Sequence, residues 1–305
     1  MSADAHIPVL FHEVLAGLQP HAGGRYIDGT LGAGGHAAGL LLQSAPDGMV
    51  LGLDWDPAAL AVAREALAPF GARAIVRLAS YVEMEVEAEG FAPVDGILLD
   101  LGLSSLQLAD PARGFAFQTE GPLDMRFSPR LKLTAAEIVN DWPLDELADI
   151  LFHYGEERHS RKLAKAIGAA RPIQTTRQLA EVVAAAAGGR REKIHPATRV
   201  FQALRIAVNG ELESVATVLP IATKLLKPGG RLAVISFHSL EDRIVKTFMR
   251  ERARGPASDP TQPDRPPFTP DLAEVTRKPI VAGAVEIGRN PRARSAKLRI
   301  AEKFA

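Results

Sequence analysis

Hydrophobic residues occur in short, continuous runs over the first 110 residues, separated by stretches with helical periodicity. Such runs are typical of strands that are buried on both faces of a sheet. The pattern predicts strands over 25–28, 49–53, 74–78 and 94–101, with helices over 36–43 and 57–68. Because strands and helices alternate, we expect a parallel sheet with right-handed crossover connections.

The alternation stops after the fourth predicted strand. The periodicity then predicts a series of helices, over 144–152, 163–170, 179–187, 200–208 and 212–226. The alternation of strands and helices then returns, with a strand at 231–236, a helix at 240–250 and a final strand at 297–301. The segment 255–270 is longer than most loops without secondary structure, so we expect it to be mobile or functional. The chain is therefore predicted to have an α/β fold, in which a mostly helical domain (106–215) interrupts a core formed by 1–105 and 216–305.

The composition, with 47% hydrophobic and 24% charged residues in a chain of 305, is ordinary for a globular protein and excludes the disordered and fibrous classes. No apolar run approaches the ~20 residues that a membrane helix needs, and the first residues lack the basic and apolar segments of a secretory signal. The chain has no cysteine, which excludes disulfides, thiolate catalysis and cysteine-ligated zinc and agrees with a cytoplasmic location.

The formal net charge of zero conceals two parts of opposite sign. Taken whole, a neutral chain argues against a nucleic-acid partner. Residues 1–110 include 14 acidic and 4 basic residues, whereas residues 111–305 include 22 acidic and 32 basic residues. This asymmetry predicts two surfaces with different roles, so the neutral total does not by itself decide against a nucleic-acid partner.

A glycine-rich turn follows the first predicted strand, in the segment DGTLGAGGH at 28–36. Glycines allow the backbone to turn sharply and to approach a ligand, and the next helix presents free amide groups to an anion. Asp54 ends the second predicted strand 19 residues after Gly35, the distance at which an acid binds ribose hydroxyls in nucleotide-binding βαβ units. The alternative is that the glycines only turn the chain and Asp54 only caps the following helix.

The glycine spacing differs from the Gly-x-Gly-x-x-Gly pattern that seats a dinucleotide. Asp28 also precedes the turn, where it would be an unfavourable neighbour for a pyrophosphate. S-adenosylmethionine has a ribose and two positive groups, an α-amino group and a sulfonium, so it suits an acidic site. We therefore expect S-adenosylmethionine as the cofactor in preference to a nicotinamide dinucleotide.

Six segments carry a resemblance to a known family, in a consistent order from about residue 6 to residue 303. They are DGTLGAGGH at 28–36, LLDLGLSSLQL at 98–108, RGF at 113–115 with GPLDMR at 121–126, HPATRVFQALR at 195–205, SFHSLEDR at 236–243 and NPRARS at 290–295. With these segments the chain resembles the RsmH (MraW) family. The resemblance implies a class I methyltransferase with a Rossmann-like sheet and an inserted helical domain. Its substrate would be the N4 amine of one cytidine in the decoding centre of bacterial 16S ribosomal RNA.

The same resemblance implies which residues bind the cofactor. Gly34, Gly35 and His36 would border its methionine end, Asp54 would bind the ribose, and Tyr81, Asp100 and Gln107 would complete the pocket. Phenylalanine is more usual in the family than the tyrosine found at position 81. The aromatic ring is still expected to pack on the adenine side.

Two acids are candidates for contact with the target amine, which must be held in line with the methyl group and must lose a proton. Asp100 ends the fourth strand, where open α/β sheets bind ligands, and we expect it to contact the cofactor, the amine or both. Asp124 follows Gly121 in a loop and is either a second amine contact or a turn residue. The Asp-Pro-Pro-Tyr run of many amino-methyltransferases does not follow the fourth strand, so that catalytic template does not apply.

Neither histidine catalysis nor a metal ion is expected. His36 begins a helix, where a protonated imidazole is disfavoured, so packing or cofactor contact is expected in place of general-base catalysis. No two histidines have the spacing of metal ligands on one predicted helix.

Basic residues gather in three places, over 190–205, 243–254 and 289–299. Such clusters are the footprint of phosphate contacts, although a solvated face with salt bridges would explain any one of them. Within these clusters we expect RNA contacts from Arg199, Arg205, Arg243, Arg292 and Arg294.

Three competing functions are less well supported. The insertion and the basic clusters disfavour a small-molecule methyltransferase, the glycine spacing disfavours a nicotinamide dehydrogenase, and Asp54 with Asp100 disfavours a non-catalytic RNA-binding protein. The expected partner is 16S ribosomal RNA within the small ribosomal subunit, and no membrane partner is expected. The sequence leaves open whether naked RNA or the assembled subunit is the substrate, and whether the protein forms a homodimer.

Overall fold

The computed structural model describes residues 8–188, 195–255 and 268–304. The chain divides into two compact units. We call Met1–Gly102 with Leu212–Ala305 the core unit, and Leu103–Glu211 the helical unit. Most of the predicted loop at 255–270 lies outside the described residues.

The core unit contains a seven-stranded sheet with the order β3-β2-β1-β4-β5-β7-β6. The strands are β1 (Arg25–Asp28), β2 (Met49–Asp54), β3 (Ala74–Leu78), β4 (Val94–Asp100), β5 (Leu226–Ser236), β6 (Leu272–Glu274) and β7 (Lys297–Lys303). The first five strands are parallel to one another, and β7 runs antiparallel to both β5 and β6. All the predicted strands are confirmed, and β6 is an additional strand of three residues.

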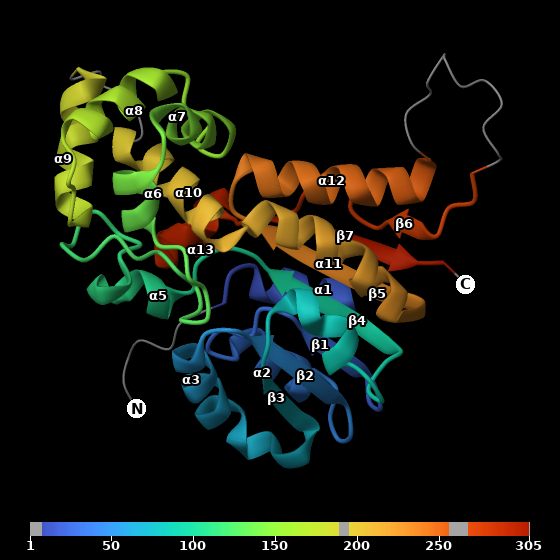
Figure 1. Ribbon diagram of the computed structural model, residues 1–305. Helices are drawn as coiled ribbons and strands as arrows, with labels where there is room; N and C mark the ends of the chain where they lie inside the picture. The colour runs from blue at the N-terminus through green and yellow to red at the C-terminus, as the bar shows by residue number, and fades with distance from the viewer. Residues whose placement is uncertain (1–7, 189–194, 256–267, 305) are drawn as a thin grey trace. The chain divides into compact units, whose positions relative to one another are not determined.

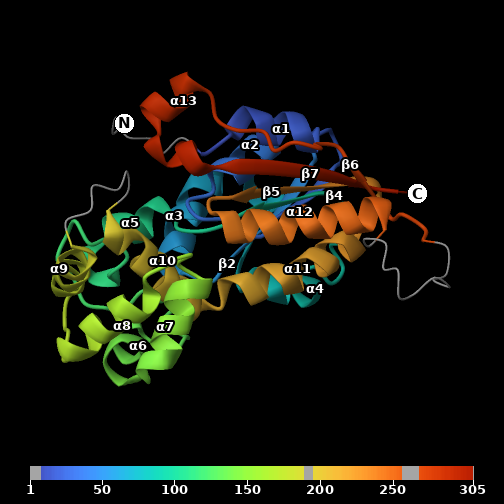
Figure 2. The same ribbon diagram turned by 90° about the horizontal axis from the view of Figure 1, so that it is seen from above.

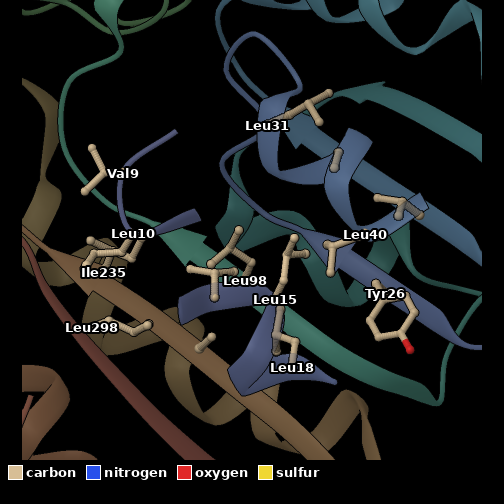
Figure 3. Close-up of a cluster of buried hydrophobic side chains, with 14 of the residues drawn as sticks. Val9, Leu10, Leu15, Leu18, Tyr26, Leu31, Leu40, Leu98, Ile235 and Leu298 are labelled. Carbon is tan, nitrogen blue, oxygen red and sulfur yellow. The ribbon is translucent and has the colours of Figure 1, made fainter. Parts of the chain in front are cut away.

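Helices cover both faces of this sheet, as Figures 1 and 2 show. One face is covered by α1 (Phe11–Leu18), α2 (Gly35–Gln43) and α3 (Pro57–Leu67), and the other by α4 (Met84–Glu87), α11 (Glu211–Leu225) and α12 (Ser239–Arg254). On the first face, Tyr26, Leu98, Ile235 and Leu298 project from four different strands into one cluster of buried side chains (Figure 3). Because both faces are buried, the strands need apolar residues at successive positions, which explains the continuous runs in the sequence. The predicted α/β class with a Rossmann-like sheet is confirmed.

The helical unit consists of α5 (Ser105–Ala109), α6 (Ala135–Asp141), α7 (Leu144–His153), α8 (Ser160–Ala169), α9 (Thr176–Ala187) and α10 (Pro196–Asn209). Helix α9 begins three residues before the predicted start at 179, because the Thr175 hydroxyl accepts a hydrogen bond from the backbone of Gln178 and the Gln178 side chain accepts one from the backbone of Thr175. Helices α7 and α8, α8 and α9, and α9 and α10 pack against one another. The remaining helix, α13 (Ala284–Arg289), belongs to the core unit.

None of the helices within 8–188, 195–255 and 268–304 has the length and apolar character needed to cross a membrane.

Candidate functional site

The glycine-rich turn connects the end of β1 to the start of α2 at the carboxyl edge of the sheet. Gly32 and Gly34 have φ values of +52° and +83°, in the left-handed region that favours glycine. A Cβ atom on Gly35 would lie 2.5 Å from the ring of Pro8, so the turn has no room for a side chain there. The first amide groups of α2 therefore face this edge with no side-chain cap.

Asp54 ends β2 and holds the glycine turn from the neighbouring strand. One carboxylate oxygen accepts a hydrogen bond from the Gly32 amide at 2.8 Å, and the other accepts one from the Asp56 amide at 2.9 Å. The cap of α3 is Asp56, whose side chain accepts from the Ala58 amide, so capping does not explain Asp54. A carboxylate has about four acceptor positions, so Asp54 retains capacity for ribose hydroxyls.

Asp100 ends β4 beside the same turn. Its amide donates to the Thr30 hydroxyl at 2.6 Å, and the Thr30 amide donates to the Asp28 carboxylate at 3.1 Å. Its Oδ2 atom lies 3.7 Å from Nε2 of His36. Its Oδ1 atom is buried and accepts no hydrogen bond from any residue that the structure describes. A buried acceptor of this kind is costly unless a ligand completes it.

Burial raises the pKa of three carboxyl groups at this edge. The pKa of Asp100 rises to about 8, mainly through burial and further through the charges of Asp28 and Glu241, while the Arg292 guanidinium opposes the rise. Burial raises the pKa of Asp28 to about 7 and that of Asp54 to about 6. A ligand that brings positive charge to this edge would favour the ionised carboxylates, so the site suits a cation.

His36 and Tyr81 flank the turn in the core unit. His36 is buried in the first turn of α2, and its ring stacks on Phe11 with 6.0 Å between the ring centroids. This packing favours a structural or cofactor-contact role for His36 over general-base catalysis. Tyr81 follows the cap residue Ser80, and a Cβ atom on Gly29 would lie 3.3 Å from the Cβ of Tyr81. The turn therefore brings this aromatic residue next to the glycines.

Asp124 belongs to the helical unit, where it forms a two-point ion pair with Arg126. The Arg126 Nε and Nη2 atoms donate to its two oxygens at 2.9 and 2.7 Å. Burial raises the pKa of Asp124, but the hydrogen bonds and charge of Arg126 outweigh it and hold the pKa below its ordinary value. Asp124 is thus ionised and fixed, which suits an acceptor of hydrogen bonds better than a group that takes up a proton.

The loop that carries Asp124 is held by Asn209, a residue that the sequence patterns do not single out. The buried Asn209 side chain accepts from the Phe127 amide at 2.7 Å and donates to the carbonyl of Met125 at 2.8 Å. Met125 has a φ of +61°, in the left-handed region, so the loop needs such support. Asn209 ends α10, 84 residues after Met125, and no local pattern reveals a contact of that span.

We expect Asn209→Ala to lower the free energy of unfolding by about 2–4 kcal/mol, because a buried amide and a buried carbonyl lose their partners. Urea unfolding followed by circular dichroism measures this change. Asn140→Ala is the matched control, since Asn140 also bridges backbone groups within the helical unit but does not contact the Asp124 loop. Methyl transfer is expected to fall in the Asn209 variant and to persist in the control. Equal activities in the two folded variants would contradict a role for the loop.

Gln107 lies on α5 in the helical unit, whereas the other predicted cofactor residues lie in the core unit. The Gln107 amide oxygen accepts from the Ser104 amide at 3.0 Å, and the Ser104 hydroxyl accepts from the Gln107 amide at 3.1 Å. This reciprocal pair caps α5. Contact between Gln107 and the cofactor stays a prediction.

The predicted RNA-binding arginines lie in different environments. Arg199 pairs with Glu157 at 3.3 Å, and Arg205 donates two hydrogen bonds to Glu211 at 2.8 and 2.9 Å. Arg243 and Arg294 are exposed, whereas Arg292 is partly buried and its charge acts on Asp100. Residues 190–193 lie outside the described residues. The ion pairs give two of these arginines a structural role, and RNA contact stays a prediction for all five.

The fold and the site together define a class of protein. A parallel sheet with the antiparallel β7 inserted beside β5, and with acids at the carboxyl ends of β1, β2 and β4, is typical of Rossmann-like methyltransferases that use S-adenosylmethionine. Of these acids, Asp28 is buried, and Asp54 and Asp100 are partly buried. The model of the MraW methylase family matches residues 3–304, and the chain belongs to this family. The predicted family, enzyme class and cofactor are thereby confirmed.

Curated relatives align with nearly the whole chain. A ribosomal RNA small subunit methyltransferase H from Thermomicrobium roseum is 53% identical over 98% of this chain and 94% of its own length. The protein of the same name from Geobacter sulfurreducens is 53% identical over 98% of this chain and 99% of its own length. Among solved structures, an rRNA methylase from Streptococcus thermophilus aligns with 99% of this chain and 100% of its own, with 12% identity and a TM-score of 0.45.

The raised pKa values predict that S-adenosylmethionine binds more tightly as the pH rises from 6 to 8. Protonated carboxyl groups must ionise to face the positive cofactor, so binding releases protons below the pKa of about 8 of Asp100. The rise should end near pH 8, where an α-amino group, with a pKa of ~8, begins to lose its own charge. Calorimetry in two buffers of different ionisation enthalpy measures both effects. A dissociation constant that is flat between pH 6 and pH 8 would contradict this assignment.

Proposed function

We propose that this methyltransferase methylates the N4 amine of a cytidine in the decoding centre of bacterial 16S ribosomal RNA, within the small ribosomal subunit and in the cytoplasm. The observation that carries the proposal is that relatives 48–53% identical, aligned over at least 98% of the chain, are named ribosomal RNA small subunit methyltransferase H. The absence of cysteine from the sequence supports the reducing compartment.

The acidic edge of the core unit fits S-adenosylmethionine. The cofactor supplies an electrophilic methyl group on a positively charged sulfur. Asp54 would accept hydrogen bonds from the ribose hydroxyls with the acceptor positions that Gly32 and Asp56 leave. Asp28 and Asp100 would stabilise positive charge, because desolvation raises the pKa of both and both ionise more readily beside a cation. The glycine turn would leave space for the methionine end.

Asp100 would also serve the target amine. The N4 lone pair of cytosine is conjugated with the ring, so the amine must be held in line and must lose a proton as its bond to the methyl carbon forms. The Oδ1 atom of Asp100 is a buried acceptor with no hydrogen bond from the described part of the chain. It would accept one N–H of the amine, and, once ionised beside the cationic cofactor, the carboxylate could take up the proton that the methylated amine loses.

Asp124 would be a second acceptor for the amine, contributed by the helical unit. Its ion pair with Arg126 keeps it ionised and fixes both oxygens. It would orient the amine by a hydrogen bond, and its lowered pKa makes it a weak acceptor of the amine's proton. We further propose that the helical insertion (106–215) is the RNA-substrate domain.

The test uses small ribosomal subunits from a strain that lacks this protein, incubated with the protein and methyl-labelled S-adenosylmethionine. We expect mass spectrometry of the digested RNA to find N4-methylcytidine at one position. A parallel reaction with naked 16S RNA separates the two forms of substrate. Label in another nucleoside, or no label on either substrate, would overturn the proposed function.

A further inference from the structure

Helix α8 of the helical unit and the turn before it carry four basic residues, three of them in the helix. Arg161 and Lys162 are adjacent in the first turn of α8, and Lys165 follows them at spacings of four and three residues, which place the three side chains on one side of the helix. Arg158 precedes the helix in the turn that leads into it. All four are exposed, and no acidic residue occurs between 158 and 171. None of the four forms an ion pair with a residue in 8–188, 195–255 or 268–304. We call these four residues the α8 stripe.

The apolar face of α8 is buried in the interior of the helical unit. Leu163, Ala164 and Ile167 are at most 3% exposed, and α8 packs between α7 and α9 (Figure 1). The helix therefore cannot rotate to bring its charged face toward acidic neighbours. The α8 stripe stays on the surface of the unit.

This arrangement disfavours the isolated helix. Like charges three or four residues apart cost ~0.2–0.5 kcal/mol per pair, and positive side chains in the first turn oppose the helix dipole. The first turn of α8 contains no acid, and its N-cap residue, His159, makes no side-chain capping bond. The partial positive charge at the N-terminus of α8 and the charges of the basic side chains thus add to one positive electrostatic potential, which attracts an anion.

A hollow of about 350 Å³ lies beside the start of α8, within the helical unit. Glu157, His159, Lys162 and Pro196 are among the residues that line it. The one acid among these four, Glu157, is engaged by Arg199 at 3.3 Å and by the His159 amide at 2.7 Å. Its negative charge is therefore compensated, so the described residues around the hollow present no free acid that would repel an anion from the α8 stripe.

We propose that the α8 stripe, with the hollow beside it, binds the phosphate backbone of the RNA substrate. The inference rests on the proposed function, because it takes the polyanion to be the RNA that is methylated. Exposed basic side chains on a fixed helix can each contact a phosphate group of the RNA backbone. Such phosphate contacts do not depend on the base sequence. A membrane surface fits less well, since a membrane-binding helix presents an apolar face and the apolar face of α8 is buried.

The test compares two triple variants with the wild-type chain. The first is Arg161→Gln, Lys162→Gln and Lys165→Gln, since glutamine keeps a high helix propensity. The control removes the same charge from exposed positions of the core unit, by Arg64→Gln, Arg277→Gln and Lys278→Gln. We measure binding to a 16S RNA transcript from 50 to 200 mM salt, S-adenosylmethionine affinity, methyl transfer, and binding to phosphatidylglycerol vesicles.

The α8 variant is expected to bind the transcript about tenfold or more weakly than the control, with a log–log salt slope smaller by ~2. Its cofactor affinity should equal that of the wild type. Unchanged RNA binding in the α8 variant, equal losses in both variants, or binding of the stripe to vesicles in place of RNA would each overturn the inference. A wild-type protein that binds RNA through the α8 stripe without methylating it would instead overturn the proposed function.

Discussion

Asp100→Asn is expected to lower kcat/KM for methyl transfer by about 100-fold or more, since removing one preorganised electrostatic contact to a transition state costs ~10²–10³. The asparagine keeps the size of the side chain but loses the negative charge beside His36 and the ability to take up a proton. The position is suited to this effect because Oδ1 is buried and Asp100 is anchored to Thr30 through its amide. Single-turnover kinetics with small ribosomal subunits would measure the change in the methyl-transfer step.

The same substitution is expected to stabilise the protein without cofactor at pH 8. The folded protein holds the Asp100 proton up to a pKa of about 8, whereas the unfolded chain releases it near 3.8. The folded state therefore binds more protons in this window, so the stability contribution of Asp100 falls as the pH rises from about 4 to about 8. Asparagine removes this loss, and a gain of at least ~1 kcal/mol is expected, since one pKa unit equals ~1.4 kcal/mol.

Asp95→Asn is the control at the other end of the same strand. Asp95 pairs with His21 and Lys227, and these partners outweigh its burial and lower its pKa. The control should therefore lose stability and keep its rate of methyl transfer. If Asp100→Asn is as active as the wild type, or is less stable at pH 8, the assigned environment of Asp100 is wrong.

Asp54→Ala is expected to weaken S-adenosylmethionine binding by about 100-fold. The substitution removes the acceptor for the ribose and also leaves the amides of Gly32 and Asp56 without their partners, each loss being worth ~1–3 kcal/mol. Isothermal titration at pH 8 measures the dissociation constant directly.

Asp56→Ala is the control for Asp54→Ala, because it removes a side chain two residues later that caps α3. The loss of this cap should cost ~1 kcal/mol of stability and leave the affinity for the cofactor within a few-fold of the wild type. A comparable loss of affinity in both variants would mean that the loop as a whole, and not the Asp54 carboxylate, determines binding.

The sequence predicts the parallel strands well because both faces of the sheet are buried and the strands are therefore continuously apolar. It does not predict β6, whose three residues are defined by pairing with β7. Helix α1 is also missed, because it has only eight residues and follows Leu10, which has a left-handed φ of +52° and provides no side-chain cap. Elements of this kind depend on tertiary contacts more than on local patterns.

The acids at the strand ends are predictable because the ends of parallel strands share one edge. The contacts that shift the pKa values of these acids cannot be predicted from the sequence. Arg292 comes from 192 positions farther along the chain than Asp100, and its effect on the pKa of Asp100 depends on how the chain folds back. Asn209 supports the Asp124 loop across more than 80 residues, and α8 falls outside the three basic clusters that the sequence indicates.

The glycine turn is joined to both neighbouring strands. The Gly29 amide donates to the Leu98 carbonyl at 2.9 Å, and the Leu31 amide donates to the Leu53 carbonyl at 2.9 Å. In addition, the Thr30 hydroxyl accepts from the Asp100 amide and the Asp54 carboxylate accepts from the Gly32 amide. The turn therefore links the backbone of Asp100 to the carboxylate of Asp54 through a few residues. The separation between these two acids is therefore a fixed length of the fold, and the edge can select a ligand by the distance between its hydroxyl groups and its charged end.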